Sequence, residues 1–273
     1  GDHRDLHSFP TRRSSDLALP RSSGDVLPST PAGIAVAVAD RLDTLVGLFA
    51  VVGAPKATAD PFGLRRAAYG AVQALVATSS RCDLRAALVE AAALQPVTCD
   101  MKVVDECLEY MTRRLEQYLV DSGCGVEAVR AVLAERGGDP AVAAETAKAL
   151  DAAVAGGSKE LKAAMTVLAR PTRLVRGKEL PDDLEVKKES LVEAEEVALY
   201  EAYVAAREKV GAEASVGDLL SAAASLSEAS EAFFDKVFVM AEEPELRRNR
   251  MSLLNAIATL PKGIVDFTEL PGF

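Results

Sequence analysis

The sequence predicts an all-α protein. Alanine is abundant, and alanine, leucine and valine recur at intervals of three and four residues, which is the spacing of one helix face. Aromatic residues make up only 5% of the chain and tryptophan is absent, so we expect helices whose backbones approach closely. Helix-start signals, in which Asp, Ser or Thr stands beside a proline, alternate with glycine or proline stops.

Length and charge limit the possible functions. The 273 residues suggest one or two domains, and 49% hydrophobic content is ample for a packed core. The net charge is −10, and a uniformly acidic surface would bind nucleic acid poorly because Lys and Arg supply most of the affinity for phosphates. Binding of RNA would therefore need local basic clusters. The most apolar long run, residues 32–52, contains Asp40, Arg41 and Asp43, so we expect no membrane span.

Residues 1–17 differ from the rest of the chain. They contain both histidines, His3 and His7, and show neither helical nor strand periodicity. The string GDHRDLHSFPTRRSSDL can be read codon for codon as the translation of a sequencing adapter. We therefore expect residues 1–26 to be a non-native, disordered lead, followed by a fragment that lacks its natural N-terminus. A transit peptide is the alternative, which the balance of acidic and basic residues in this segment opposes.

The first part of the chain is expected to contain helices at about residues 31–52, 61–78 and 83–94. Ser29 or Thr30 caps the first of them, ahead of Pro31. Asp60 caps the second, and Pro61 supplies its first helical φ angle. These signals predict a corner between two helices at Asp60.

The rest of the chain is expected to form helical hairpins without a fixed repeat. Gln95-Pro96 separates them from the first part, because a residue before proline avoids the helical region. The expected helices cover about residues 100–121, 126–134, 140–155, 159–168, 189–210, 216–224, 228–240 and 244–260. Residues 170–183, bounded by Pro171 and Pro181, are expected to form a long irregular loop, and loops of that length are usually functional or mobile.

Four short segments carry a family resemblance. They are ADRLDTLVG at residues 39–47, DPFGLRR at residues 60–66, AFFDKVFVM at residues 232–240 and ELRRNRMSLL at residues 245–254. In this order they resemble the β subunit, or fused β region, of bacterial-type heterotetrameric glycyl-tRNA synthetase, over about residues 27–273. The ending LPKGIVDF at residues 260–267 resembles organellar forms of plants and algae. The resemblance implies a plastid or mitochondrial location, with the bacterial cytoplasm as the alternative.

The resemblance also implies a domain organisation and a role. Residues 27–96 would be the end of a degenerate HD-like helical domain, and residues 97–273 a helical anticodon-binding domain of the class I synthetase type. The whole enzyme would join glycine to tRNA-Gly with ATP and Mg²⁺. This segment has no glycine-rich phosphate loop and no nucleotide-binding signature, so we expect no catalytic residue and no cofactor in it. Catalysis would belong to the α subunit or fused α region, its partner in an oligomer.

The candidate tRNA contacts are basic residues gathered in two clusters and at one helix start. They are Arg170, Arg173, Arg176 and Lys178 in the expected loop, Arg247, Arg248, Asn249 and Arg250 in the last long helix, and Arg65 and Arg66 after Asp60. Arg173 and Arg176 are the preferred anticodon readers, because Arg can read the Watson–Crick edges of unpaired bases. Bacterial relatives commonly show Lys-Arg-Val-x-Asn-Ile where residues 172–177 read TRLVRG, so Arg176 replaces an Asn. Solvated surface and ion pairs are the alternative explanation for each cluster.

Three further features are assigned structural roles. The segment ADRLD also resembles the late Asp helix of HD-type metal phosphohydrolases, but residues 18–273 contain no histidine to complete a metal site. Asp40 and Asp43 are therefore expected to be degenerate HD carboxylates without metal. Phenylalanines 233, 234 and 238 are expected to form a core stripe, and the four cysteines, which lack CxxC spacing, to be reduced and partly buried thiols. An HD-type phosphohydrolase remnant and a non-catalytic helical scaffold remain the alternatives to tRNA binding.

Overall fold

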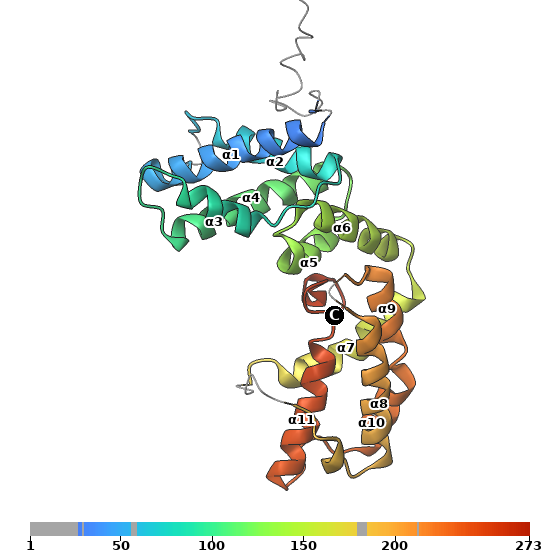
Figure 1. Cartoon of the computed structure of the whole chain (residues 1–273). Coiled ribbons are helices and arrows are strands. Elements are labelled where there is room, and N and C mark those ends of the chain that lie inside the picture. Colours follow the sequence, from blue (N-terminus) through green and yellow to red (C-terminus); the bar gives the residue numbers. More distant parts are fainter. Residues whose placement is uncertain (1–26, 29, 56–58, 179–184, 212) are drawn as a thin grey trace, which may run out of the picture. The chain divides into compact units, whose positions relative to one another are not determined.

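The computed structural model describes residues 27–28, 30–55, 59–178, 185–211 and 213–273. Within these ranges the chain forms eleven α-helices and no strand, which confirms the all-α prediction (Figure 1). The expected lead at residues 1–26 lies outside the described residues, as do Ser29 and the end of the expected loop. The chain divides into two compact units, residues 1–123 with 137–145, and residues 124–136 with 146–273.

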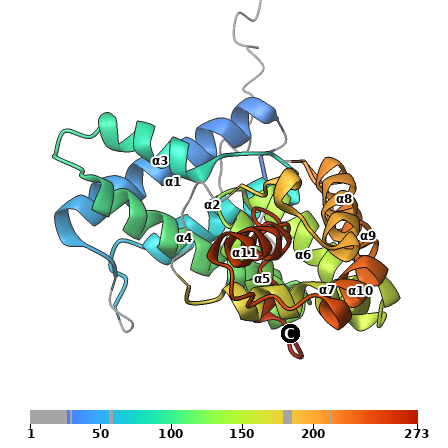
Figure 2. The same ribbon diagram turned by 90° about the horizontal axis from the view of Figure 1, so that it is seen from below.

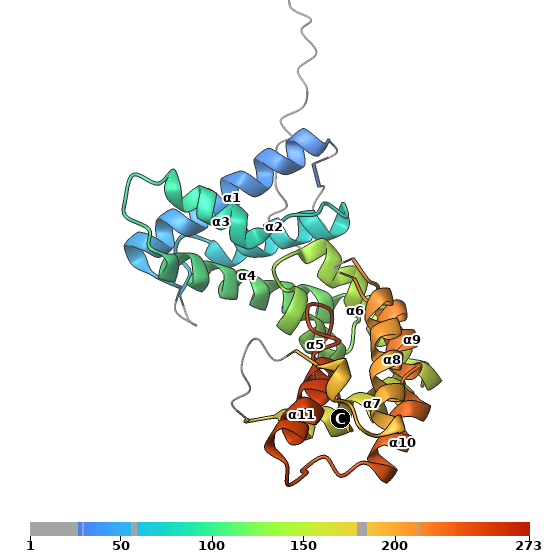
Figure 3. The same cartoon turned by 60° about the horizontal axis from the view of Figure 1, so that its bottom comes forward.

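The first unit contains four helices that pack on one another. They are α1 (Pro31–Val52), α2 (Leu64–Ala77), α3 (Leu84–Ala93) and α4 (Met101–Asp121), and Figure 3 shows them as one group. The hydroxyl of Thr30 accepts a hydrogen bond from the Gly33 amide at 3.1 Å and caps α1, as predicted. The buried face of α1 is wide and includes Val46 and Phe49 as well as Leu42 and Leu45. The reason is that α1 packs against α2, α3 and α4 together.

The corner at Asp60 differs from the prediction in its geometry. The helix α2 begins at Leu64, so Pro61 is not its first residue, and Gly63 stands before it with a φ of 69°. A left-handed residue of this kind favours glycine, which has no Cβ. Asp60 still caps the helix, because its carboxylate accepts hydrogen bonds from the amides of Leu64 at 2.8 Å and Arg65 at 3.0 Å. The sequence therefore identified the capping residue but placed the helix start three residues too early.

Replacing Asp60 by alanine is expected to lower the free energy of unfolding by about 1–2 kcal/mol, because two helix-start amides lose their acceptor. Asp60→Asn retains one carbonyl oxygen and should recover part of that loss. Urea unfolding of the three proteins measures the difference. An alanine variant as stable as the parent would show that water replaces the carboxylate at no cost.

The second unit is built around a long helix, α7 (Lys159–Val175), which packs against α9, α10 and α11. Its other helices are α5 (Val126–Arg136), α8 (Ala194–Lys209), α9 (Val216–Ala224), α10 (Ser227–Lys236) and α11 (Pro244–Ala258). The helix α6 (Pro140–Ala155) has residues in both units. In Figures 1 and 2, α8 lies beside α9 and α10. A short turn of 3₁₀ helix, η3 (Phe267–Glu269), packs on α5.

The prediction of an irregular segment from residue 170 is wrong, because α7 continues through Pro171 to Val175. Proline inside a helix removes one backbone hydrogen bond and normally kinks or ends the helix. Here Pro171 is buried, and packing of α7 against α9 and α11 holds the helix together beyond it. The amide of Arg176 then donates to the Thr172 carbonyl at 2.9 Å and closes the last turn. Two of the four basic residues of the expected loop are therefore on a helix.

Candidate RNA-binding surface

The C-terminal end of α7 presents four exposed basic residues, Arg170, Arg173, Arg176 and Lys178, here called the α7 basic cluster. Arg170 and Arg173 are three residues apart on the helix and so lie on the same side of it. Arg176 is the C-cap of α7, and Lys178 follows it. Among the described residues, neither Arg173 nor Arg176 has a carboxylate partner within salt-bridge distance. Both guanidinium groups are thus available to a ligand.

Helix electrostatics account for part of this arrangement. Cations in the last turn of a helix interact favourably with its dipole, typically by about 0.3–1 kcal/mol at an exposed position. Arg173 lies in the last turn of α7 and has this role. The same interaction does not require Arg170 one turn earlier, or Lys178 beyond the cap. The accumulation of charge therefore exceeds what stabilisation of the helix needs.

Arg170 has a specific partner on a neighbouring helix. Its guanidinium carbon lies 4.0 Å from the centroid of the Phe234 ring on α10, which is a cation–π contact. This contact holds the Arg170 side chain between two hollows of the surface. The smaller hollow, of about 150 Å³, contains Glu231 and Asp235 as well as Phe234.

The larger hollow is a groove of about 850 Å³ that runs along α7. Its walls also include Val154 at the end of α6 and residues 270–272 near the C-terminus. Three cations of α7 line the groove: Lys162, Arg170 and Arg173. The apolar floor is made by Leu161, Met165 and Ala169 of the same helix. Sequence reasoning missed Lys162. Its spacing of eight residues from Arg170 is the signal that could have found it, since residues four and eight apart share a helix face.

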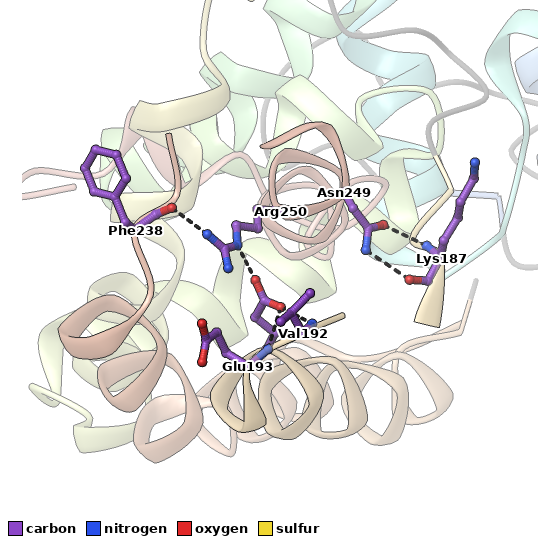
Figure 4. Close-up of polar contacts among 7 residues, drawn as sticks. Lys187, Val192, Glu193, Phe238, Asn249 and Arg250 are labelled. Atoms are coloured by element: carbon purple, nitrogen blue, oxygen red, sulfur yellow. Dashed lines mark hydrogen bonds and ion pairs between the residues drawn. The ribbon is translucent and has the colours of Figure 1, made fainter. Parts of the chain in front are cut away.

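The basic segment of α11 has a different environment. Arg248 is exposed and Arg247 is half-buried, but Asn249 and Arg250 are each only 5% exposed. The Asn249 side chain binds the backbone of Lys187 twice, accepting from its amide at 2.8 Å and donating to its carbonyl at 2.9 Å (Figure 4). Asn249 thus fixes the chain ahead of α8 and has no free polar atom to offer to a base at this position.

Arg250 forms a buried ion pair with Glu196, which is 0% exposed. Its Nε donates to the Glu196 carboxylate, and its Nη1 donates to the Phe238 carbonyl at 2.8 Å (Figure 4). The other carboxylate oxygen of Glu196 accepts from the amides of Val192 at 2.6 Å and Glu193 at 3.0 Å, which caps α8. Arg250 therefore joins the start of α8 to the segment after α10.

The phenylalanines near the end of α10 do not form one stripe. Phe233 is 0% exposed and Phe234 is half-buried under Arg170, whereas Phe238 is 72% exposed. The core prediction is right for Phe233 and wrong for Phe238. The reason is that α10 ends at Lys236, so Phe238 lies beyond the helix and not on its buried face. Figure 4 shows its ring pointing away from the Arg250 guanidinium.

Comparison with known proteins identifies the relatives of this chain. The family model described as glycyl-tRNA synthetase beta subunit matches residues 13–134. The chain is 43% identical over 258 residues to the chloroplastic/mitochondrial glycine–tRNA ligase 2 of Arabidopsis thaliana, covering 94% of this chain and 24% of that protein. It is 35% identical over 262 residues to the glycine–tRNA ligase beta subunit of Actinobacillus succinogenes, covering 92% of this chain and 37% of that subunit. Over more than nine tenths of its length, the chain is similar to part of the glycyl-tRNA synthetase β subunits.

The match to the glycyl-tRNA synthetase β subunit family is partial in length. The glycine–tRNA ligase beta subunit of an Escherichia coli strain is 35% identical over 261 residues, and again the chain covers 37% of it. The chain thus spans between 24% and 37% of the length of these relatives. The family model ends at residue 134, so the α7 basic cluster is related to the family through these relatives. The family model begins at Arg13, which lies within residues 1–17, the segment whose composition differs from the rest of the chain.

In the first unit of this chain, the two carboxylates Asp40 and Asp43 have partners close by. Asp40 is exposed and pairs with Arg41 at 2.8 Å, and Asp43 accepts from the Gln95 side chain at 2.6 Å. Within the described ranges, no group of three or more His, Cys, Asp or Glu residues is placed to hold a metal ion. Arg65 is half-buried at the Asp60 corner, and Arg66 is exposed. These two arginines lie in the first unit, whereas the α7 basic cluster lies in the second.

The four cysteines are free thiols. Cys107 and Cys124 are buried and Cys82 and Cys99 are half-buried, as the sequence predicts. Burial raises the pKa of Cys107 to about 12, so this thiol stays protonated and unreactive at neutral pH. Among the described residues, no helix has the length and apolar character needed to cross a membrane.

Proposed function

We propose that this chain is a C-terminal tRNA-binding part of a glycine–tRNA ligase β region and that it recognises the anticodon of tRNA-Gly. The observation that carries the proposal is the α7 basic cluster, four exposed cations at one helix end in a chain with a net charge of −10. Neutralisation of phosphates by Lys and Arg is the main source of RNA affinity, so this end of α7 is where RNA would bind.

The roles within the cluster follow from side-chain chemistry. Arg173 and Arg176 lack acidic partners among the described residues, and a guanidinium fork matches the edges of unpaired bases. Lys178 acts as a point charge toward a phosphate. Arg248 of α11 is exposed and can add a second phosphate contact. Asn249 and Arg250 are excluded from the proposed contacts because their side chains are buried and bound within the protein.

The domain types belong to the same proposal. Residues 27–96 would be the end of a degenerate HD-like helical domain, in which Asp40 and Asp43 make only surface contacts. Residues 97–273 would form the anticodon-binding domain of the class I synthetase type. Arg65 and Arg66 would contact the RNA backbone or a neighbouring domain.

The partial length of the match supports a division of labour with parts of the enzyme outside this chain. The α subunit or a fused α region would form the glycyl adenylate with ATP and Mg²⁺, in an oligomer with the β region. One relative is a chloroplastic/mitochondrial enzyme, which supports a plastid or mitochondrial location over the bacterial cytoplasm.

Binding of this chain to transcribed tRNA-Gly at two salt concentrations tests the RNA-binding surface. The affinity should fall as salt rises, with a logarithmic slope near −0.7 for each phosphate contact to a single strand. Lys178→Ala should reduce the slope by about one such contact, and Arg173→Ala or Arg176→Ala should weaken binding by about ten-fold. Lys209→Ala, an exposed lysine at the end of α8, is the matched control and should change neither. Weak binding that none of these substitutions alters would contradict the proposal.

A further inference from the structure

We propose that the groove along α7 receives the base of one unpaired nucleotide of a bound RNA. The inference rests on the proposed function, because it assumes that the α7 basic cluster contacts RNA. It adds a defined site, a new contact residue in Lys162, and a ligand of stated chemistry, an extruded nucleotide with its phosphate.

The size and floor of the groove suit a base. Its volume of about 850 Å³ lies within the range of about 300–1,000 Å³ that is typical of small-molecule sites. The floor is made by Leu161, Met165 and Ala169, whose side chains offer an apolar surface to the flat face of a base. Contact of the flat face of a base with such a surface removes apolar area from water, which is favourable.

The charges around the groove favour an anionic ligand in a particular place. Lys162, Arg170 and Arg173 line it, and among the described residues its lining contains no acidic side chain. The adjoining smaller hollow contains Glu231 and Asp235, which would repel a phosphate. A nucleotide would therefore place its phosphate on the side of Lys162 and Arg173, away from α10.

Arg170 lies at the boundary between the two hollows and connects the groove with the rest of the surface. Its guanidinium is held by the Phe234 ring at 4.0 Å, and it lines both hollows. Guanidinium groups stack on bases as well as on aromatic side chains. Because Arg170 and Arg173 belong to both the groove and the α7 basic cluster, an RNA strand bound to the cluster can place one base in the groove without crossing an acidic surface.

The test uses a short single-stranded RNA that carries a fluorescent adenine analogue whose emission falls when the base stacks, with the fully paired duplex of the same sequence as a second probe. Two substitutions act on the groove. Lys162→Ala removes a cation, and Ala169→Glu places a carboxylate on the apolar floor, where it would repel the phosphate of a nucleotide. Each has a matched control outside the groove: Lys159→Ala on the same helix, and Ala205→Glu on an exposed position of α8. Thermal unfolding of all four variants checks that they are folded.

Among the described residues the lining of the groove has no aromatic side chain, so an adenine analogue that leaves the stack of its neighbours for the groove should emit more strongly. The parent chain should therefore raise the emission of the single strand and not that of the duplex. Lys162→Ala and Ala169→Glu should each weaken binding of the single strand by about ten-fold and remove the rise in emission, while both controls behave like the parent. If Arg173→Ala weakens binding but neither groove variant does, the groove is not the base site although the proposed function stands. If no variant and no salt change alters binding, both proposals fail. Tighter binding of a short acidic peptide than of RNA, lost in Lys162→Ala, would also contradict the inference.

Discussion

Replacing Arg250 by methionine is expected to lower the free energy of unfolding by about 3–5 kcal/mol. The Glu196 carboxylate is 0% exposed, so removal of Arg250 leaves a buried charge that keeps the amide hydrogen bonds of Val192 and Glu193 but loses its counter-ion. The Phe238 carbonyl loses its donor in the same variant. Arg248→Met replaces an exposed neighbour on the same helix and should change stability by no more than about 0.5 kcal/mol.

A double-mutant cycle separates the ion pair from its surroundings. Glu196→Gln alone should also destabilise, because the buried Arg250 then loses its counter-ion and keeps the Phe238 carbonyl as an acceptor. The double variant should lose less than the sum of the two single variants, by about 0.5–3 kcal/mol of coupling energy. Urea unfolding of the parent and four variants measures these values. If Arg250→Met were as mild as Arg248→Met, the buried pair would not hold α8 and α11 together.

Replacing Phe233 by alanine is expected to cost about 3–5 kcal/mol of unfolding free energy, because a fully buried ring would leave a cavity. Phe238→Ala removes a ring that is 72% exposed, and the expected change is within about 0.5 kcal/mol. The two residues have the same side chain and lie five positions apart, so they are controls for each other. Chemical denaturation of both variants measures the two free energies of unfolding. A loss at Phe238 comparable to that at Phe233 would mean that Phe238 is covered in the folded protein.

The sequence was most informative where a signal acts locally. Capping by Thr30 was predicted, and the structure shows the hydroxyl bound to a helix-start amide. Ser158 likewise caps α7 by accepting from the Leu161 amide at 3.2 Å, and the helix begins at residue 159, as expected. These contacts involve residues three apart, and the same side chain makes them in any fold that contains the helix.

Predictions failed where distant partners decide the outcome. Pro171 normally ends a helix, but the packing of α9 and α11 on α7 keeps it helical. Arg248 and Arg250 stand two positions apart in one basic run, yet the first is exposed and the second pairs with Glu196, 54 residues away. Adjacent basic residues look equivalent in the sequence, because the face of α11 that meets α8 is set by the tertiary fold.

Part of the candidate surface could not be predicted, because it too depends on residues that are distant in the sequence. The cations of the α7 basic cluster were identified from their density, but their arrangement on a helix end was not. Lys162 was missed because it lies outside the dense run and joins the groove only through the helical repeat of α7. The contact between Arg170 and Phe234 joins residues of two helices that no local pattern relates.

The most direct test of the central claim compares the affinity of this chain for tRNA-Gly with its affinity for the same tRNA whose anticodon cytosines are changed, and for a non-cognate tRNA. If the chain recognises the anticodon, it should bind the unchanged tRNA about ten-fold or more tightly, and Arg173→Ala or Arg176→Ala should remove that preference. Equal affinity for all three RNAs, with no effect of either substitution, would contradict anticodon recognition by this part of the β region.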